Sequence, residues 1–240
     1  HAWDEGWAFY AGSTVAATAA GAVTDDGTLI WELAEKRGYD FGTTHSTGPA
    51  TVNVMLLAEF IDGRDKIIAA DCAGAEPIID NIIKQMSIPL IQGTLKYAWL
   101  ADPAIDGTWC AYEAGNTALT ASDYCATAWA DAWAFAAAIL PRIDQCSSTA
   151  AATIKTNIDI AAPTPMAGGF AAVKAAMEST YACLGITCAD VGAYDSSWSS
   201  CACPAEEAAV QDCLSNQQSL DDGFFADDDD DDGDDDDFSP

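Results

Sequence analysis

Apolar residues recur at helical spacing along most of residues 2–183. The aromatic residues Trp3, Trp7 and Tyr10 follow the i, i+4, i+7 rhythm that is typical of one face of a helix. Alternation with a period of two, which marks a half-buried strand, is scarce. The pattern therefore predicts an all-α fold, and an antiparallel helical array is its simplest packing.

Capping residues, glycines and prolines delimit the expected helices. We expect Gly38 to stop one helix, Pro89 to end or kink another, and Pro141 to stop the longest. A loop is expected over residues 39–49, and a crossover connection over 102–115. The helices are predicted over residues 2–20, 29–36, 50–61 with a continuation through 67–70, 90–100, 116–140, 147–160, 170–183 and 204–214, with one more beginning at Asp71 or Cys72.

One aromatic helix is nearly repeated along the chain. The segment Trp3–Ser13 returns 126 positions later as Trp129–Ile139, with five of eleven residues identical. A match that uses two tryptophans in register indicates an internal duplication. The spacings after the two copies differ, so the duplication is partial, with pseudo-repeats over about 1–101 and 116–183.

The two copies differ in their polar residues. Glu5 corresponds to Asp131, but Ala130 and Ala136 stand where the first copy has Asp4 and Tyr10. The shared residues are therefore packing residues. We expect any site to use the first copy.

The chain is strongly acidic. Nine Lys and Arg against 38 Asp and Glu give a net charge of −29 in 240 residues. This charge argues against binding to nucleic acid or to anionic membrane surfaces, so cations, neutral molecules or other proteins are the expected partners. We predict one helical domain over 1–220, followed over 221–240 by a disordered tail with 12 Asp.

The nine cysteines favour disulfides over zinc. Their close pairs, Cys183-x4-Cys188 and Cys201-x-Cys203, lack the paired spacing of zinc sites. Disulfides are typical of secreted proteins, and the cysteine-rich residues 183–214 are predicted to form a stapled cap. Nine is odd, so one thiol is free, buried or bonded to another chain.

No apolar run approaches the ~20 residues that a membrane-spanning helix needs. The chain begins at His1 without a methionine. A removed signal peptide and a simple fragment boundary both account for that start.

A family resemblance is carried by five segments, Trp3–Ser13, Gly63–Lys66, Ile88–Gly93, Trp133–Pro141 and Ala182–Gly192. They resemble algal secreted proteins related to the low-iron-inducible periplasmic iron-assimilation family. The resemblance implies a secreted or cell-surface protein that helps an alga to capture iron, with a proposed role related to that of phytotransferrins. It does not assign ligands residue by residue.

Ferric iron and other hard cations such as calcium favour oxygen ligands, with an occasional imidazole. The candidate metal ligands are Asp4, Glu5, Tyr10 and His45, with Asp131 as the counterpart in the second copy. The first three converge only if the chain before Gly6 is not regular helix. The alternative is that the aromatics belong to the core and the carboxylates cap the helix.

Catalysis finds no support in the sequence. The chain has two histidines and none of the nucleophile, zinc-protease, phosphate-loop or dinucleotide motifs. We therefore expect a protein that is not an enzyme. The leading hypothesis is a secreted protein that binds iron or another hard cation; the alternative is a structural or interaction subunit of an extracellular assembly.

Overall fold

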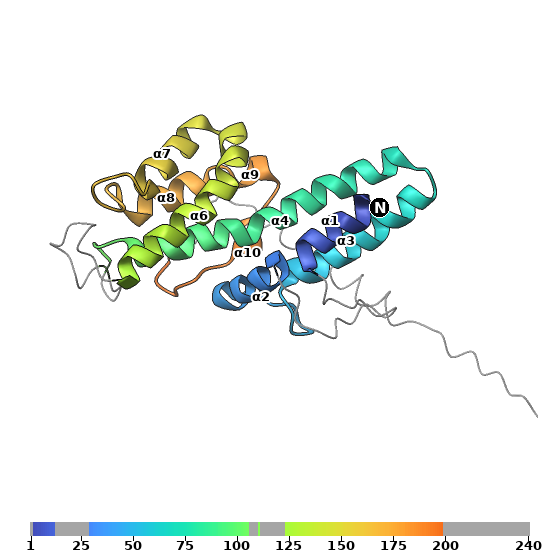
Figure 1. Cartoon of the computed structure of the whole chain (residues 1–240), viewed down its shortest axis with the longest axis horizontal. Helices are drawn as coiled ribbons and strands as arrows, with labels where there is room; N and C mark the ends of the chain where they lie inside the picture. The colour runs from blue at the N-terminus through green and yellow to red at the C-terminus, as the bar shows by residue number, and fades with distance from the viewer. Residues whose placement is uncertain (1, 13–28, 106–109, 111–122, 199–240) are drawn as a thin grey trace, which may run out of the picture. The chain divides into compact units, whose positions relative to one another are not determined.

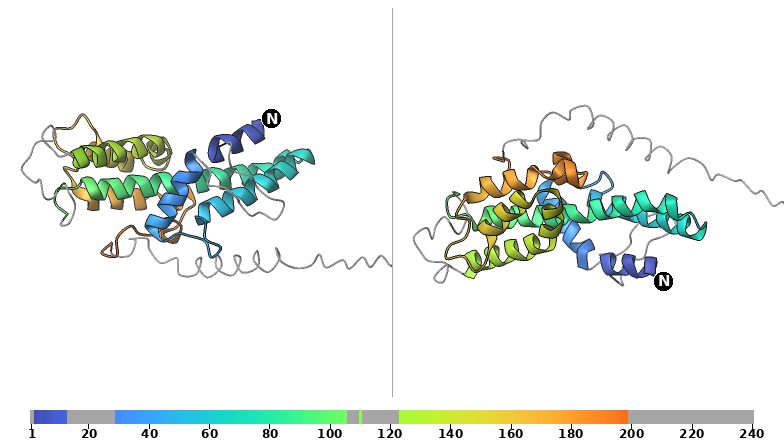
Figure 2. Two further views of the ribbon diagram at one scale, coloured as in Figure 1. Left: turned by 60° about the horizontal axis from the view of Figure 1, so that its bottom comes forward. Right: turned by 90° about the horizontal axis from the view of Figure 1, so that it is seen from above.

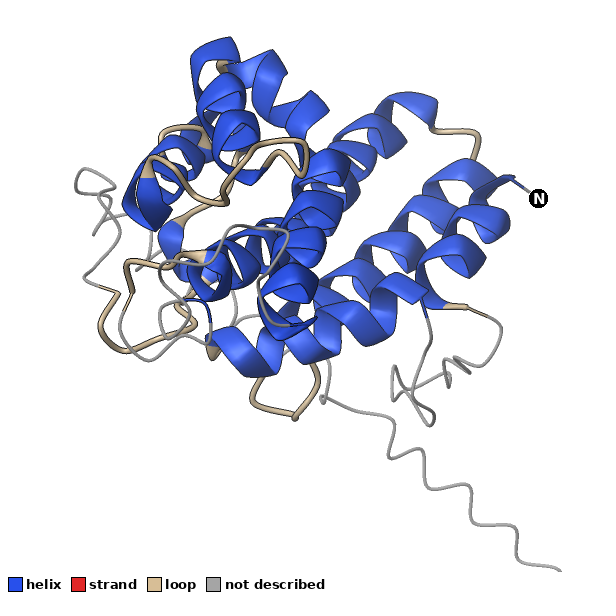
Figure 3. Cartoon of the chain, turned by 60° about the vertical axis from the view of Figure 1, so that its left-hand side comes forward, coloured by secondary structure: helices blue, strands red, loops and turns tan. Residues whose placement is uncertain are grey.

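The computed structural model describes residues 2–12, 29–105, 110 and 123–198. These residues form nine helices and no strand, which confirms the all-α prediction (Figure 3). One isolated bridge joins Thr44 to Ala50. The helices are α1 (Ala2–Ala11), α2 (Leu29–Phe41), α3 (Thr51–Ile68), α4 (Cys72–Ala101), α6 (Asp123–Cys146), α7 (Ser148–Ile158), α8 (Gly169–Glu178), α9 (Tyr181–Leu184) and α10 (Cys188–Val191).

Helix α4 is the element on which the others are arranged (Figures 1 and 2). Its first half lies beside α3, where Asn81 Nδ2 donates to Glu59 Oε1 at 3.0 Å. Its second half lies beside α6, where the Tyr97 and Phe135 rings stack at 5.6 Å. Short turns join α3 to α4 and α6 to α7, so these neighbours run antiparallel. The packing agrees with the expected helical array.

Helix α4 begins as predicted but does not break at Pro89. Asp71 caps its first turn by accepting a hydrogen bond from Gly74 N at 2.9 Å. The helix then continues through Pro89 to Ala101, so the expected end at Pro89 is wrong, whereas the alternative, a kink there, stays a prediction. A proline inside a helix costs about 3 kcal/mol. Burial of Ile88 and Ile91 on either side offsets that cost, because each buried isoleucine contributes about 1.5–3 kcal/mol.

Two other predicted helix ends are also wrong. Helix α2 continues past Gly38 to Phe41, because Gly38 is a packing residue: a Cβ there would lie 2.8 Å from Ala50 Cβ. Helix α6 continues past Pro141 to Cys146. Residues 116–122 of its predicted range lie outside the described residues.

The predicted continuation of the 50–61 helix through 67–70 is confirmed, because α3 is one continuous helix that ends at Ile68. One further boundary differs from the prediction. The helix expected over 170–183 is instead two helices, α8 and α9, separated at Ser179 and Thr180. Their hydroxyl groups donate to the carbonyls of Ala176 and Met177, both at 2.7 Å, and so compete with helix continuation. The N-cap of α7 is Ser147, one of the two serines at the start of the predicted helix.

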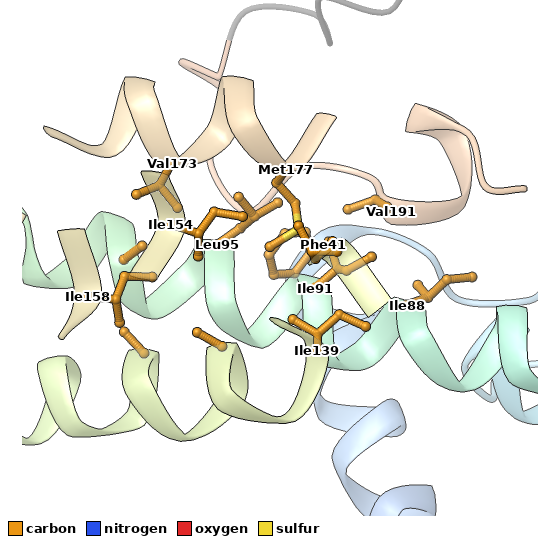
Figure 4. Close-up of a cluster of buried hydrophobic side chains, with 14 of the residues drawn as sticks. Phe41, Ile88, Ile91, Leu95, Ile139, Ile154, Ile158, Val173, Met177 and Val191 are labelled. Atoms are coloured by element: carbon orange, nitrogen blue, oxygen red, sulfur yellow. The ribbon is translucent and has the colours of Figure 1, made fainter. Parts of the chain in front are cut away.

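The core lies between α4, α6, α7 and α8 (Figure 4). Side chains from all four helices are fully buried there, which follows from an apolar stripe on each helix. The central members are Ile91, Leu95, Ile139, Ile154, Ile158, Val173 and Met177.

Close packing of α4 on α6 depends on Gly93. A Cβ at this position would lie 2.5 Å from Phe135 Cδ1, and Tyr97 stacks on the same ring. We expect Gly93→Ala to lower the free energy of unfolding by about 1–2 kcal/mol, because overpacking outweighs the better helix propensity of alanine. Denaturant unfolding measures the change.

The control for Gly93 is a glycine with room for a methyl group. Gly6 in α1 has Phe60 Cε1 3.7 Å from the ideal Cβ position, which is ordinary contact. Gly6→Ala should leave stability unchanged or raise it by up to about 1 kcal/mol. Equal losses in both variants would contradict the packing argument.

The two copies of the aromatic helix share one anchoring contact. Trp3 Nε1 donates to Phe60 O at 2.8 Å, and the equivalent Trp129 Nε1 donates to Ile158 O at 2.9 Å. The next aromatics differ, since Phe9 is 76% exposed while its counterpart Phe135 packs between α4 and α6. The copies therefore share a tryptophan anchor and differ in what surrounds it.

The disulfide prediction is confirmed for five of the six described cysteines. Cys110 bonds to Cys125, Cys146 bonds to Cys183, and Cys188 is disulfide-bonded as well. Cys72 is an exposed free thiol at the start of α4. Whether it links two chains stays a prediction.

The C-terminal predictions fall largely outside the described residues. The cap predicted over 183–214 is described only to residue 198, where the disulfide at Cys183 ties its first residue to the end of α6. The helix predicted over 204–214, the domain boundary at 220 and the acidic tail over 221–240 are not described. None of the described helices has the length and hydropathy to cross a membrane.

Candidate functional site

The structure does not bring the predicted metal ligands of the first copy together. Helix α1 is regular from Ala2 to Ala11, so its residues advance by about 100° per position. Asp4, Glu5 and Tyr10 consequently point in three directions, with Asp4 and Glu5 exposed and Tyr10 buried. The irregular start that convergence required is not present.

Tyr10 serves as a hydrogen-bond donor inside the core. Its hydroxyl donates to Asn53 Oδ1, and Asn53 Nδ2 donates to Trp31 O at 3.1 Å and to Glu35 Oε1 at 2.6 Å. Burial, assisted by the charge of Glu35, raises the pKa of Tyr10 well above its usual value. The phenol is therefore neutral at physiological pH and is occupied within the protein.

His45 lies in the loop between α2 and α3 and is partly exposed. Its Nδ1 accepts a hydrogen bond from Thr47 N at 3.2 Å and lies 2.8 Å from Thr47 Oγ1. Only Nε2 thus remains for a ligand. Within the described part of the chain, no group of three or more His, Cys, Asp or Glu residues is placed to hold a metal ion.

A different cluster gathers charged side chains around Arg37. Arg37 and Asp40 lie three residues apart on α2, which places them on one face. The Arg37 Nη2 atom lies 2.9 Å from Asp40 Oδ2, and Lys96 Nζ from α4 lies 2.7 Å from the same oxygen. Arg37 is only 5% exposed. Two cations therefore share one carboxylate oxygen in a largely buried place.

Aromatic rings surround these two cations. The Arg37 guanidinium carbon lies 5.4 Å from the Tyr97 ring centroid and 6.0 Å from that of Phe135. Lys96 Nζ lies 4.9 Å from the Tyr194 ring centroid. Such cation–π contacts stabilise a desolvated charge by about 0.5–2 kcal/mol each. The rings therefore stabilise both cations in this largely buried place.

Two neighbouring acidic groups have raised pKa values. Burial raises the pKa of Asp131 on α6, and the charge of Arg37 opposes that rise. Burial likewise raises the pKa of Tyr194, with further contributions from Asp40 and Tyr124. Shifts that combine burial with specific charges are common at functional sites. Asp131 is the counterpart of Glu5, so this cluster lies beside the second copy of the repeat.

The chemistry of the cluster suits an anion better than a cation. Asp40 is already paired with two positive groups, and a metal ion would meet both of them. By contrast, Arg37 Nε and Nη1 are buried without a hydrogen-bond partner. The sequence analysis did not select Arg37 or Lys96. The available signal was that they are two of only nine basic residues in an acidic chain.

Comparison with known proteins identifies the family. The model of the Fea1 family, described as low iron-inducible periplasmic protein, matches residues 1–211. The chain belongs to the Fea1 family. The expected resemblance is thereby confirmed, and the family description agrees with the predicted location outside the cytoplasm. No curated protein and no solved structure matches the chain.

Two of the family-like segments in this Fea1 chain contain packing glycines. Gly63 lies against Trp3, where a Cβ would be 2.2 Å from Cζ2, and Gly93 lies against Phe135. Both glycines therefore allow an aromatic side chain of another helix to approach the backbone. These residues specify helix packing and do not identify metal ligands.

Proposed function

We propose that this Fea1-family protein binds ferric iron, or another hard cation, outside the cytoplasm as a step in iron uptake. The observation that carries the proposal is the family match over residues 1–211. The net charge of −29 supports it, because an acidic surface concentrates cations and carboxylates suit hard ones. The proposed role is binding without catalysis.

The proposed cation ligands are exposed carboxylates. Asp4 and Glu5, two of the four predicted ligands, are adjacent and exposed in the first turn of α1. Tyr10 could join them only by breaking its hydrogen bond to Asn53 and losing its proton inside the core. We therefore assign the first-copy ligands to Asp4 and Glu5, with His45 Nε2 as a further candidate.

We expect the double variant Asp4→Asn/Glu5→Gln to bind ferric iron at least about tenfold more weakly than the natural sequence, a change equivalent to about 1.4 kcal/mol. The matched control is Glu76→Gln/Asp80→Asn, which removes two exposed carboxylates from α4. It should change the affinity less than about twofold, well under 1 kcal/mol. Iron is supplied as ferric nitrilotriacetate at fixed ionic strength, and bound metal is measured after removal of the chelate.

The possible results separate the assignment of the ligands from the iron-binding function. Equal losses in both double variants would show diffuse counterion binding and would remove the assignment to Asp4 and Glu5. If the protein with the natural sequence retained no bound iron, the proposed function itself would be refuted. Tyr10→Phe should bind iron normally; a visible phenolate-to-iron band that this variant loses would contradict the buried, neutral Tyr10.

A further inference from the structure

We propose that Arg37 and Lys96 form a binding site for a small oxyanion. The site is separate from the predicted cation ligands and goes beyond iron binding. It lies between α2 and α4, with Phe135 of α6 and Tyr194 beside it. Unpaired hydrogen-bond donors, the local positive charge and limited access by solvent support this site.

The unpaired donors belong to a deeply buried side chain. Arg37 is 5% exposed, and of its three nitrogens only Nη2 has a partner, Asp40. The Nε and Nη1 atoms are buried without one. A guanidinium carries five N–H donors in one plane, and buried donors are nearly always paired. Such unpaired donors in a folded core indicate a ligand that accepts hydrogen bonds.

Lys96 adds donors beside those of Arg37. Its ammonium has three N–H groups, and Asp40 Oδ2 accepts from one of them at 2.7 Å. The same oxygen lies 2.9 Å from Arg37 Nη2, so the two cations approach each other across a single atom. Both also lie near the Tyr97 ring, at 5.4 and 5.8 Å from its centroid. The donors of both cations thus belong to one place.

The local charge is positive although the protein is strongly acidic. Arg37 and Lys96 together carry two positive charges, and among the residues that the structure describes Asp40 supplies the one carboxylate paired with them. Arg37 also acts on Asp131, whose pKa is raised by burial and lowered less strongly by the charge of Arg37. The rings of Tyr97 and Tyr194 lie beside the two cations. One added monoanion would balance the charge.

Access limits the size of the ligand. The side chains of Lys96 and Asp40 are 15% and 20% exposed, so the solvent reaches this place only at its edge. A large ligand would have to displace the aromatic rings around the cations. Charge-assisted hydrogen bonds from arginine favour a carboxylate-type or phosphate-type oxygen group. A small oxyanion of a few atoms therefore fits best.

Calorimetric titration of the full chain in metal-free Tris chloride tests the proposal. Formate provides a planar probe and inorganic phosphate a tetrahedral one, each compared with sodium chloride at equal ionic strength. We expect one of them to bind with one-to-one stoichiometry. Binding should be at least tenfold weaker in Lys96→Gln and in Arg37→Gln, whereas Lys36→Gln should bind as the natural sequence does. Lys36 is exposed and adjacent to Arg37 on α2.

The two probes distinguish the geometry of the oxyanion that the site accepts. Binding of formate alone supports a planar site, and binding of phosphate alone supports a tetrahedral one. If Arg37→Gln does not fold, the less buried Lys96→Gln still decides the question. Failure of both probes to bind the natural sequence, or binding that neither variant weakens, would overturn the proposal, with water then pairing the Arg37 donors. Because no iron is present, this result is independent of the iron titration.

Discussion

Replacing Cys146 and Cys183 together by alanine is expected to lower the free energy of unfolding by about 4 kcal/mol. The disulfide joins the last residue of α6 to α9 across a sequence separation of 37 residues. Its loss frees that length of chain in the unfolded state, and the entropy of the unfolded state rises accordingly. The prediction is measured by denaturant unfolding of the double variant beside the natural protein.

Cys72→Ala is the matched control for this experiment. Cys72 is an exposed free thiol, so its replacement should change stability by less than about 0.5 kcal/mol. If the double variant unfolded at the same denaturant concentration as the control, the cross-link would contribute nothing to stability. The chain-entropy argument would then fail for this protein.

Asn53→Ala is expected to lower the free energy of unfolding by about 3–5 kcal/mol. The Asn53 side chain is fully buried and bonds to the Tyr10 hydroxyl, Glu35 Oε1 and Trp31 O. Removing it leaves these buried polar groups without that partner and opens a small cavity. The expected loss is large because the Asn53 side chain on α3 links α1 and α2 through these hydrogen bonds.

Two further variants test the network around Asn53. Asn81→Ala removes an exposed asparagine that bonds to Glu59, and should cost no more than about 0.5 kcal/mol. Tyr10→Phe should cost about 1–2 kcal/mol, and adding it to Asn53→Ala should cost less than the sum because the two residues share a hydrogen bond. Full additivity, measured by a double-mutant cycle, would contradict the coupling.

Local sequence rules located the helices and some of their ends. The helical spacing of apolar residues predicted an all-α fold, and the caps at Asp71 and Ser147 lie where capping chemistry requires. The cysteine spacing likewise predicted disulfides. These features depend on residues that are neighbours in the sequence, or on residue type alone.

Tertiary packing decided where prolines and glycines do not end a helix. Pro89 and Pro141 both lie inside helices, and Gly38 lies inside α2. Their local propensity predicted helix ends, but at the prolines burial of nearby side chains contributes more than the lost backbone hydrogen bond costs. Gly38 stays in its helix because only a residue without a Cβ fits against Ala50. No pattern along the chain contains that information.

The sequence by itself determined the helices, the acidity, the disulfide chemistry and the resemblance to the family. The tertiary structure decided which of the chemical groups are available. It placed the Tyr10 phenol in the core, where burial keeps it neutral, and it brought Arg37 and Lys96 from separate helices to one carboxylate. Availability depends on burial and on partners far away in the sequence, and both arise only when the helices pack.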